Sequence, residues 1–195
     1  VALDLVERRP GQLRQATVHP LASNLAMIHG AAAIAMVNYL ASLAAATLPE
    51  DEPLPRLFPL FDALFAAAGA GSDALTMGAA LVRLELALLA ELGLGLDLAS
   101  CAATGTRDDL AFVSPKSRQA VSRAAGLPYA AKLLPLPAFL LAGGPADAAA
   151  LADGLKLAGH FLLRDLLAGN PAEPRVWAAR ERLCGLLLAP GQAPG

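Results

Sequence analysis

Cysteine, aromatic residues and charge are all scarce in this chain of 195 residues. Its two cysteines, Cys101 and Cys184, lie far apart, which argues against a disulfide framework and favours a reducing compartment. Charged residues make up 16% of the sequence and the formal net charge is −2, so global charge alone does not suit a protein that coats nucleic acid. Hydrophobic residues make up 56%, which is enough for a substantial core and argues against disorder.

Charge is absent from Gln15 to Pro49, and this run is long enough to contain a membrane-spanning helix. Much of it is alanine, which favours lipid only weakly, and polar side chains such as His29 and Asn38 interrupt it. We expect a buried helix of a bundle here, and a membrane-associated helical protein is the alternative.

Helical patterns dominate the chain after a first segment in which Pro10-Gly11 predicts a turn between two short strands. In the most apolar helix we expect Arg83 and Glu85 at the margin of the bundle and four leucines facing inward, namely Leu81, Leu84, Leu88 and Leu92. The expected helices run from a cap at Ser23 or Asn24 to about Thr47, from Phe61 to Ala68, from a cap at Ser72 or Asp73 through Ala74 to Leu92, from about Asp147 to Leu167, and from about Arg175 to Leu188.

The stretch CAATGTRDDLAFVSPKSRQAVSRAAG, which begins at Cys101, has the outline of a zinc knuckle that lacks most of its ligands. In a knuckle, two pairs of metal-binding side chains converge tetrahedrally on the metal. The corresponding positions here are Cys101, Thr104, Ser122 and Ala125, and only the cysteine supplies a thiolate. We therefore expect no bound zinc, and we expect Cys101 to be a small buried residue, because only the distant Arg107 is available to activate its thiol.

Recognisable catalytic motifs are missing from the sequence. It has no phosphate-cradling loop, no HExxH motif and no carboxylate pair in a polar setting. His160 lies in an apolar helical pattern without a serine or cysteine at a recognisable spacing, which is typical of a core or boundary residue. We expect a protein that is not an enzyme and needs no cofactor.

Acidic residues are absent from Leu110 to Ala146, a segment that contains several basic ones. An ordinary solvated loop explains this local excess, and contact with phosphates is the functional alternative. A second basic set is interleaved with acidic residues, and helical ion pairs account for much of it. The first set is Lys116, Arg118, Arg123 and Lys132, and the second is Lys156, Arg164, Arg175, Arg180 and Arg182.

Several segments, in their order and spacing, resemble the C-terminal portion of the bacterial recombination mediator family RecO. They are RLELALLAELGLGLDLASC, LAFVSPKSRQAVS, LPLPAFL, GHFLLRDLL and ARERL, and the resemblance covers about Leu21 to Leu188. Many members of that family have a four-cysteine zinc knuckle at this point, and others have lost it. The resemblance implies that the knuckle persists here as a fold element without its metal.

The resemblance also implies a fold and a division of the chain. It predicts a mainly α protein, a helical bundle with a small degenerate knuckle-like insert at about 99–127. This helical domain would comprise residues 22–195. Residues 1–21 would be the C-terminal remnant of an oligonucleotide-binding β-barrel (OB-fold), most of which is missing from this sequence.

The function implied by the resemblance is that of a DNA repair and homologous recombination mediator in the bacterial cytoplasm, associated with the nucleoid and not with a membrane. Its expected partners are single- and double-stranded DNA, RecR, the C-terminal tail of single-stranded DNA-binding protein and, indirectly, RecA. It would promote strand annealing and recombinase loading in the RecF pathway. A helical protein–protein adaptor without DNA binding is the alternative. Expected DNA contacts are Lys116, Arg118, Arg123 and Lys132, and expected contacts to the partner tail are Lys156, Arg164 and Arg180.

A first prediction concerns zinc. Thr104, Ser122 and Ala125 occupy ligand positions without suitable side chains. Protein purified without a chelator should therefore contain well under one zinc per chain by elemental analysis. A tightly held, stoichiometric zinc whose removal unfolds the protein would contradict the interpretation as a degenerate knuckle.

Overall fold

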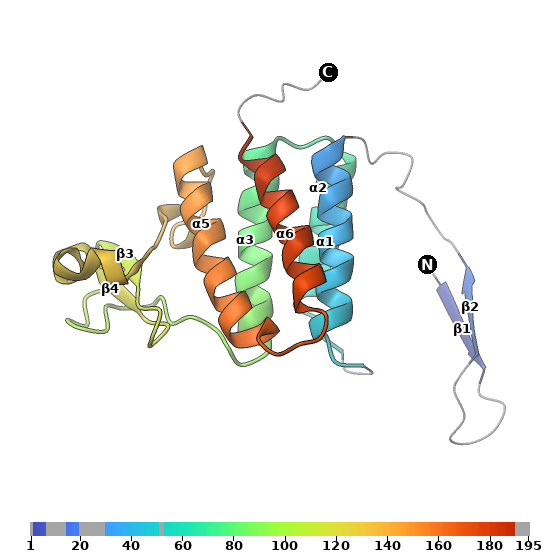
Figure 1. Cartoon of the computed structure of the whole chain (residues 1–195), viewed down its shortest axis with the longest axis horizontal. Coiled ribbons are helices and arrows are strands. Elements are labelled where there is room, and N and C mark those ends of the chain that lie inside the picture. The colour runs from blue at the N-terminus through green and yellow to red at the C-terminus, as the bar shows by residue number, and fades with distance from the viewer. Residues whose placement is uncertain (1, 7–14, 20–29, 51–52, 190–195) are drawn as a thin grey trace.

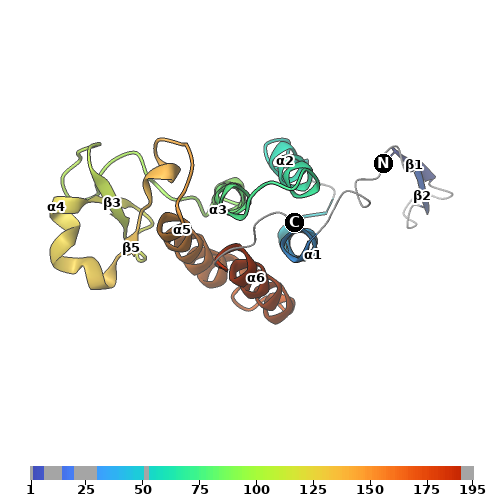
Figure 2. The same cartoon turned by 90° about the horizontal axis from the view of Figure 1, so that it is seen from above.

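The computed structural model describes residues 2–6, 15–19, 30–50 and 53–189. Long helices lie side by side in a bundle, and a small sheet with short helical segments projects from one end of it, beyond α5 (Figures 1 and 2). The mainly helical architecture expected from the sequence is confirmed. The bundle helices are α1 (Ala31–Thr47), α2 (Phe58–Gly69), α3 (Ala74–Glu91), α5 (Ala148–Phe161) and α6 (Glu173–Leu187).

The bundle has one continuous apolar core. α1 packs against α6 and α3 packs against α5, while α2 contacts both α1 and α3. Leu40 of α1, Leu88 of α3 and Phe161 of α5 are completely buried. The charge-free helix α1 is thus a core element of the bundle, as predicted. No helix in the described ranges combines the length and hydropathy that a bilayer span demands.

Local sequence signals explain most helix ends. Asp73 and Asp147 cap α3 and α5, where each carboxylate accepts a hydrogen bond from a backbone N–H three residues ahead. α2 begins at Phe58 and α6 at Glu173, both slightly earlier than expected, because each tolerates a proline in its first turn. The helix cap expected at Ser23 or Asn24 lies outside the described residues.

The helix expected to reach Leu167 changes its geometry on the way. α5 ends at Phe161, and the chain continues as the π-helix η4 (Leu162–Leu167). Short π-helical segments widen the backbone turn and are frequent at functional sites. This change of geometry sets the direction of Arg164 and Asp165, which face the projecting sheet.

Two antiparallel strands precede the bundle. β1 (Ala2–Val6) pairs with β2 (Gln15–His19), with Ala2 opposite His19. The predicted strands are therefore present, while the turn at Pro10-Gly11 lies outside the described residues. The assignment of residues 1–21 to the remnant of a barrel stays a prediction.

α3 has the inward-facing leucines that its sequence predicted. Leu81, Leu84 and Leu88 are completely buried, and Leu92 is half-buried. Arg83 is half-buried at the margin, where its guanidinium donates to the carbonyl oxygen of Gly144 at 2.8 Å. The expectation for Glu85 was wrong: this residue is 0% exposed, because another helix supplies the opposite charge.

That opposite charge is Arg180 of α6, which is 4% exposed. Its guanidinium donates to both carboxylate oxygens of Glu85, each at 2.8 Å, and to the carbonyl oxygen of Leu155 at 2.8 Å. The Tyr39 hydroxyl donates to the same carboxylate at 2.6 Å. Burial tends to lower the pKa of Arg180, but the charge of Glu85 outweighs this and raises it. Burial and Glu85 together raise the pKa of Tyr39, so its hydroxyl stays protonated and donates.

Replacing Leu88 with alanine should lower the free energy of unfolding by about 2–5 kcal/mol, because the change removes buried methyl groups and leaves a cavity. Denaturant titration measures this loss. The matched control is Leu141→Ala, whose leucine is 41% exposed and should matter much less. A loss below about 0.5 kcal/mol for Leu88→Ala would show that α3 is not central to the core.

Arg180→Ala should lower the free energy of unfolding by about 3–5 kcal/mol, because it leaves the buried Glu85 carboxylate without its charge partner. The same helix offers a control, since Arg182 is exposed and its replacement by alanine should change stability by less than about 0.5 kcal/mol. Equal effects of the two substitutions in urea titrations would contradict the importance of the buried pair.

Candidate nucleic-acid interface

The projecting element corresponds to the predicted knuckle-like insert. Its sheet has the order β4-β3-β5, with all neighbours antiparallel. A short helix, α4, follows β4 and continues directly into the 3-10 helix η2, which leads to β5. The bounds are β3 (Leu110–Val113), β4 (Ala120–Ser122), α4 (Arg123–Gly126), η2 (Leu127–Lys132) and β5 (Leu134–Pro135).

Cys101 is the first of the four positions predicted to form a degenerate metal site. It is 2% exposed, which confirms the expected buried position. Its Sγ accepts a hydrogen bond from the backbone N–H of Ser122 at 3.2 Å. Hydrogen bonds from Ser122, and then from Thr104, lower the pKa of the Cys101 thiol to about 6. The structure therefore brings three of the four knuckle positions together around one sulfur atom.

Sequence reasoning missed this effect on the thiol because it sought a neighbouring cation, whereas the cause is hydrogen bonding across the insert. Ala125, at the fourth knuckle position, is half-buried and packs against the core. Within the described residues, no three His, Cys, Asp or Glu side chains are grouped as a metal would require. Packing and hydrogen bonds connect the elements of this insert.

Lys116 and Arg118 lie in the turn between β3 and β4. The turn is closed by a hydrogen bond from the Arg118 N–H to the Ser114 carbonyl oxygen at 2.9 Å. Arg118 has a φ of 62°, a left-handed conformation that is unusual for a side chain other than glycine. Lys116 is exposed at the tip of the turn, while Arg118 points back toward the bundle.

Asp165 of the π-helix η4 anchors this turn to the bundle. Its carboxylate accepts from Arg118 Nε at 3.1 Å and from Arg164 Nη2 at 2.6 Å, and Arg164 also donates to the carbonyl oxygen of Pro115. The hydrogen bond from Arg164, together with the charge of Arg118, lowers the pKa of Asp165. The expected DNA contact Arg118 and the expected partner contact Arg164 thus meet at one carboxylate, which no spacing in the sequence indicated.

Arg123 and Lys132 lie elsewhere in the insert. Arg123 begins α4 at the far end of β4 from Arg118, and its Nε is 3.1 Å from Asp109 Oδ1. Both of these side chains are about 60% exposed, and an ion pair this exposed contributes little stability. Lys132 is exposed at the end of η2. Within the described part of the chain, neither Lys116 nor Lys132 takes part in an ion pair.

The expected partner contacts have different surroundings. Lys156 is exposed on α5, and Arg164 is exposed where η4 contacts the turn. Arg180 does not fit the expectation, because its guanidinium is inside the bundle with Glu85 and cannot form the rim of a surface groove. His160 is half-buried. Burial is the larger cause that lowers its pKa, and the charge of Arg164 lowers it further. This position matches the boundary residue predicted from the sequence.

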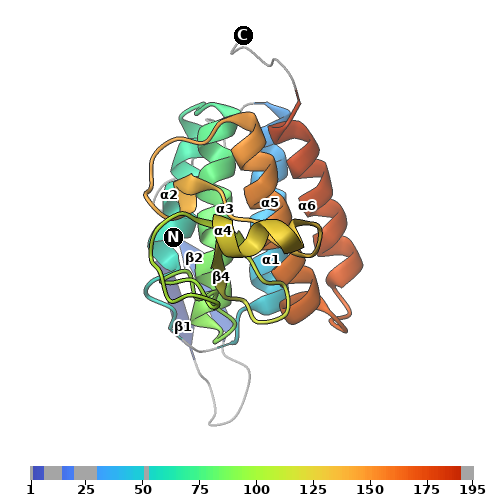
Figure 3. The same cartoon turned by 90° about the vertical axis from the view of Figure 1, so that its left-hand side faces the viewer.

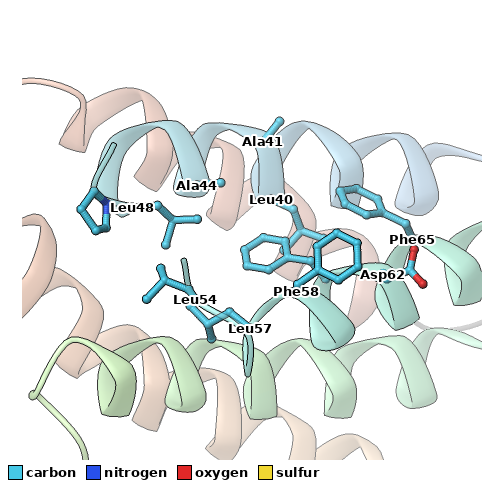
Figure 4. Close-up of a pocket in the computed structure, with 11 residues that line it drawn as sticks. Leu40, Ala41, Ala44, Leu48, Leu54, Leu57, Phe58, Asp62 and Phe65 are labelled. Atoms are coloured by element: carbon cyan, nitrogen blue, oxygen red, sulfur yellow. The ribbon is translucent and has the colours of Figure 1, made fainter. Parts of the chain in front are cut away.

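Hollows that the sequence did not predict lie between helices in the described part of the bundle. Between α1 and α2 is an apolar groove of about 420 Å³ whose lining includes Leu40 of α1 and Phe58, Phe61 and Phe65 of α2. Asp62 lies at one end of it, beside Phe65 (Figure 4). The second hollow, of about 380 Å³, lies between α1 and α6. Its lining residues are Ile34, Ala35, Asn38, Ala178, Ala179 and Arg182.

Comparison with known proteins assigns the chain to a family. The family described as "Recombination protein O C terminal" matches residues 30–172. A protein named DNA repair protein RecO from Cereibacter sphaeroides is 44% identical over 178 residues, which cover 88% of this chain and 70% of that protein. The DNA repair protein RecO of Chelativorans sp. is 45% identical over 175 residues, which cover 88% of this chain and 67% of that protein. That of Acidiphilium cryptum is 47% identical over 158 residues, which cover 75% of this chain and 62% of that protein.

No solved structure matches the chain. The family match nevertheless extends from α1 through η4, including the whole insert, and ends just before α6. The chain therefore belongs to the RecO family of DNA repair and recombination proteins.

Proposed function

We propose that this chain is a recombination mediator that binds DNA and partner proteins without catalysing covalent chemistry. It would bind single- and double-stranded DNA, promote strand annealing and assist recombinase loading in the RecF pathway. Family membership supports the general role, and the exposed basic residues of the insert support the contact with DNA. We place the protein in the bacterial cytoplasm, at the nucleoid, where RecR and, indirectly, RecA would be its partners.

The proposed DNA surface is the insert, whose basic residues are, among the described residues, either exposed without an ion pair or already paired with a carboxylate. Lys116 and Lys132 are exposed, so they can reach phosphates directly. Arg118 and Arg123 already contact Asp165 and Asp109, so a phosphate would have to compete with a carboxylate for each of them. We therefore assign the larger part of phosphate binding to the two lysines. Such contacts are independent of base sequence, because they involve charge and not base edges.

The proposed protein ligand is the C-terminal tail of single-stranded DNA-binding protein, which is acidic and ends in phenylalanine with a free carboxylate. Such a tail suits an apolar hollow with a cation at its edge. The α1–α6 hollow supplies the cation, the exposed Arg182, beside the half-exposed Ile34, in a lining that also contains the polar Asn38. The α1–α2 groove suits the tail less well, because its charged lining residue is Asp62. Lys156 and Arg164 remain proposed contacts to the same tail.

The double variant Lys116→Ala, Lys132→Ala should bind DNA more weakly and with a flatter dependence on salt. Each lost phosphate contact reduces the slope of log affinity against log salt by about 0.7 for single strands and about 0.9 for duplex. Two lost contacts should therefore reduce the slope by roughly 1.4 and 1.8, respectively. Fluorescence anisotropy with labelled oligonucleotides at a series of low salt concentrations measures both quantities.

A second double variant and a distant control make the result specific. Arg118→Ala, Arg123→Ala should change the slope less than the lysine variant, because both arginines are already paired. Arg56→Ala, at a residue that is 85% exposed and precedes α2, should bind as the unchanged protein does. Identical affinity and slope for the lysine variant and the unchanged protein would remove the insert from the DNA surface and favour the adaptor function.

A further inference from the structure

The helical segment formed by α4 and η2 is largely exposed to solvent. It extends from Arg123 to Lys132 at the end of the molecule and crosses in front of the bundle in Figure 3. Gly126 holds it against the sheet so closely that a Cβ there would lie 2.4 Å from the ring of Phe112. No residue of η2 is buried. The segment is therefore fixed on one side and open to solvent on the other.

Large apolar side chains are exposed on this open segment. Tyr129 is 63% exposed and Leu127 is 61% exposed. Tyr39, the other tyrosine, is completely buried in the bundle. Folding therefore does not account for the position of Tyr129, whose ring gains little from burial where it is.

The geometry of a 3-10 helix places Tyr129 beside a cation. With about three residues per turn, side chains at i and i+3 are eclipsed, so Tyr129 and Lys132 project from the same face of η2. Arg123 lies at the start of the same helical segment, and its ion pair with Asp109 is exposed and weak. An open aromatic ring thus stands next to one free ammonium group, with a guanidinium nearby along the segment.

An aromatic ring flanked by cations has the chemistry of a site for unpaired bases. Every base has a π-face that can stack on an aromatic side chain, and cations beside the ring can contact the backbone phosphates. The bases of a duplex are stacked on one another and are not open to such a ring. The absence of acidic residues from Leu110 to Ala146 gives this part of the chain the charge that a polyanion requires.

We propose that the α4–η2 segment is a stacking platform for single-stranded DNA. The ring of Tyr129 stacks on an unpaired base, while Lys132 and Arg123 contact the phosphates beside it. This inference rests on the proposed binding of DNA and adds a preference to it: the lysines attract any DNA, and Tyr129 favours single strands over duplex.

The test compares Tyr129→Ala with Tyr129→Phe on a labelled oligothymidylate and on a duplex of equal length. Loss of one stacked base should weaken single-strand binding by about 5- to 150-fold, without changing the salt slope, because stacking releases no counterions. Tyr129→Phe should bind as the unchanged protein does, and duplex binding should be the same for all three. The control Phe58→Ala removes an aromatic side chain that is 74% exposed on α2, far from the insert, and should have no effect.

A thermodynamic cycle identifies the stacked base. An oligonucleotide with abasic sites should bind the unchanged protein about as weakly as intact DNA binds Tyr129→Ala, and combining the two changes should cause no further loss. An unaltered single-strand affinity for Tyr129→Ala, or an equal loss on duplex, would overturn the platform. If the lysine variant still flattens the salt slope in that case, the proposed DNA binding stands, whereas failure of the unchanged protein to bind DNA at low salt would overturn both.

Discussion

The buried ion pair between Glu85 and Arg180 is the constraint on which the rest of the structure depends. It lies in the core of a chain with little charge, where an unpaired carboxylate or guanidinium would be very costly. The pair joins α3 to α6, the hydroxyl of Tyr39 adds α1, and the carbonyl oxygen of Leu155 adds α5. Gly159 allows the close approach, because a Cβ there would lie 2.6 Å from the guanidinium. Hydrophobic contacts are non-directional, whereas the hydrogen bonds of this network require specific distances and angles between the helices.

The position of the insert follows from that arrangement. Once α5 is fixed in the bundle, its π-helical continuation presents Asp165 and Arg164 to the turn between β3 and β4. Within the insert, the sulfur of Cys101 accepts a hydrogen bond from the backbone N–H of Ser122, which links the segment before β3 to the end of β4. Hydrogen bonds and packing thus give the insert a defined orientation, as a bound metal does in a complete knuckle. A surface loop without these contacts could not present a tyrosine and two lysines in a fixed geometry.

Scarcity of charge makes each free cation informative. Arg180 is used in the core, Arg118 and Arg164 anchor the insert, and Arg83 binds backbone carbonyl groups at the margin of the bundle. The exposed lysines of the insert differ from these arginines because, within the ranges that the structure describes, they form none of these structural contacts. The same reasoning separates Tyr129 from Tyr39, since one ring is buried in the ion-pair network and the other is open to solvent.

The sequence by itself determined the helical class and most helix boundaries, because periodicity and caps are local properties. Its missing ligands also predict a degenerate knuckle. It also determined that basic residues predominate from Leu110 to Ala146. It did not predict the burial of Glu85 and Arg180, since each charge is tolerated in the core only because the other, far away in the chain, comes within hydrogen-bonding distance. The contact of Arg118 with Asp165 and the lowered pKa of Cys101 have the same origin in contacts between distant segments. Only the tertiary structure decided which charges hold the fold together and which stay exposed, because it alone determines which charges meet.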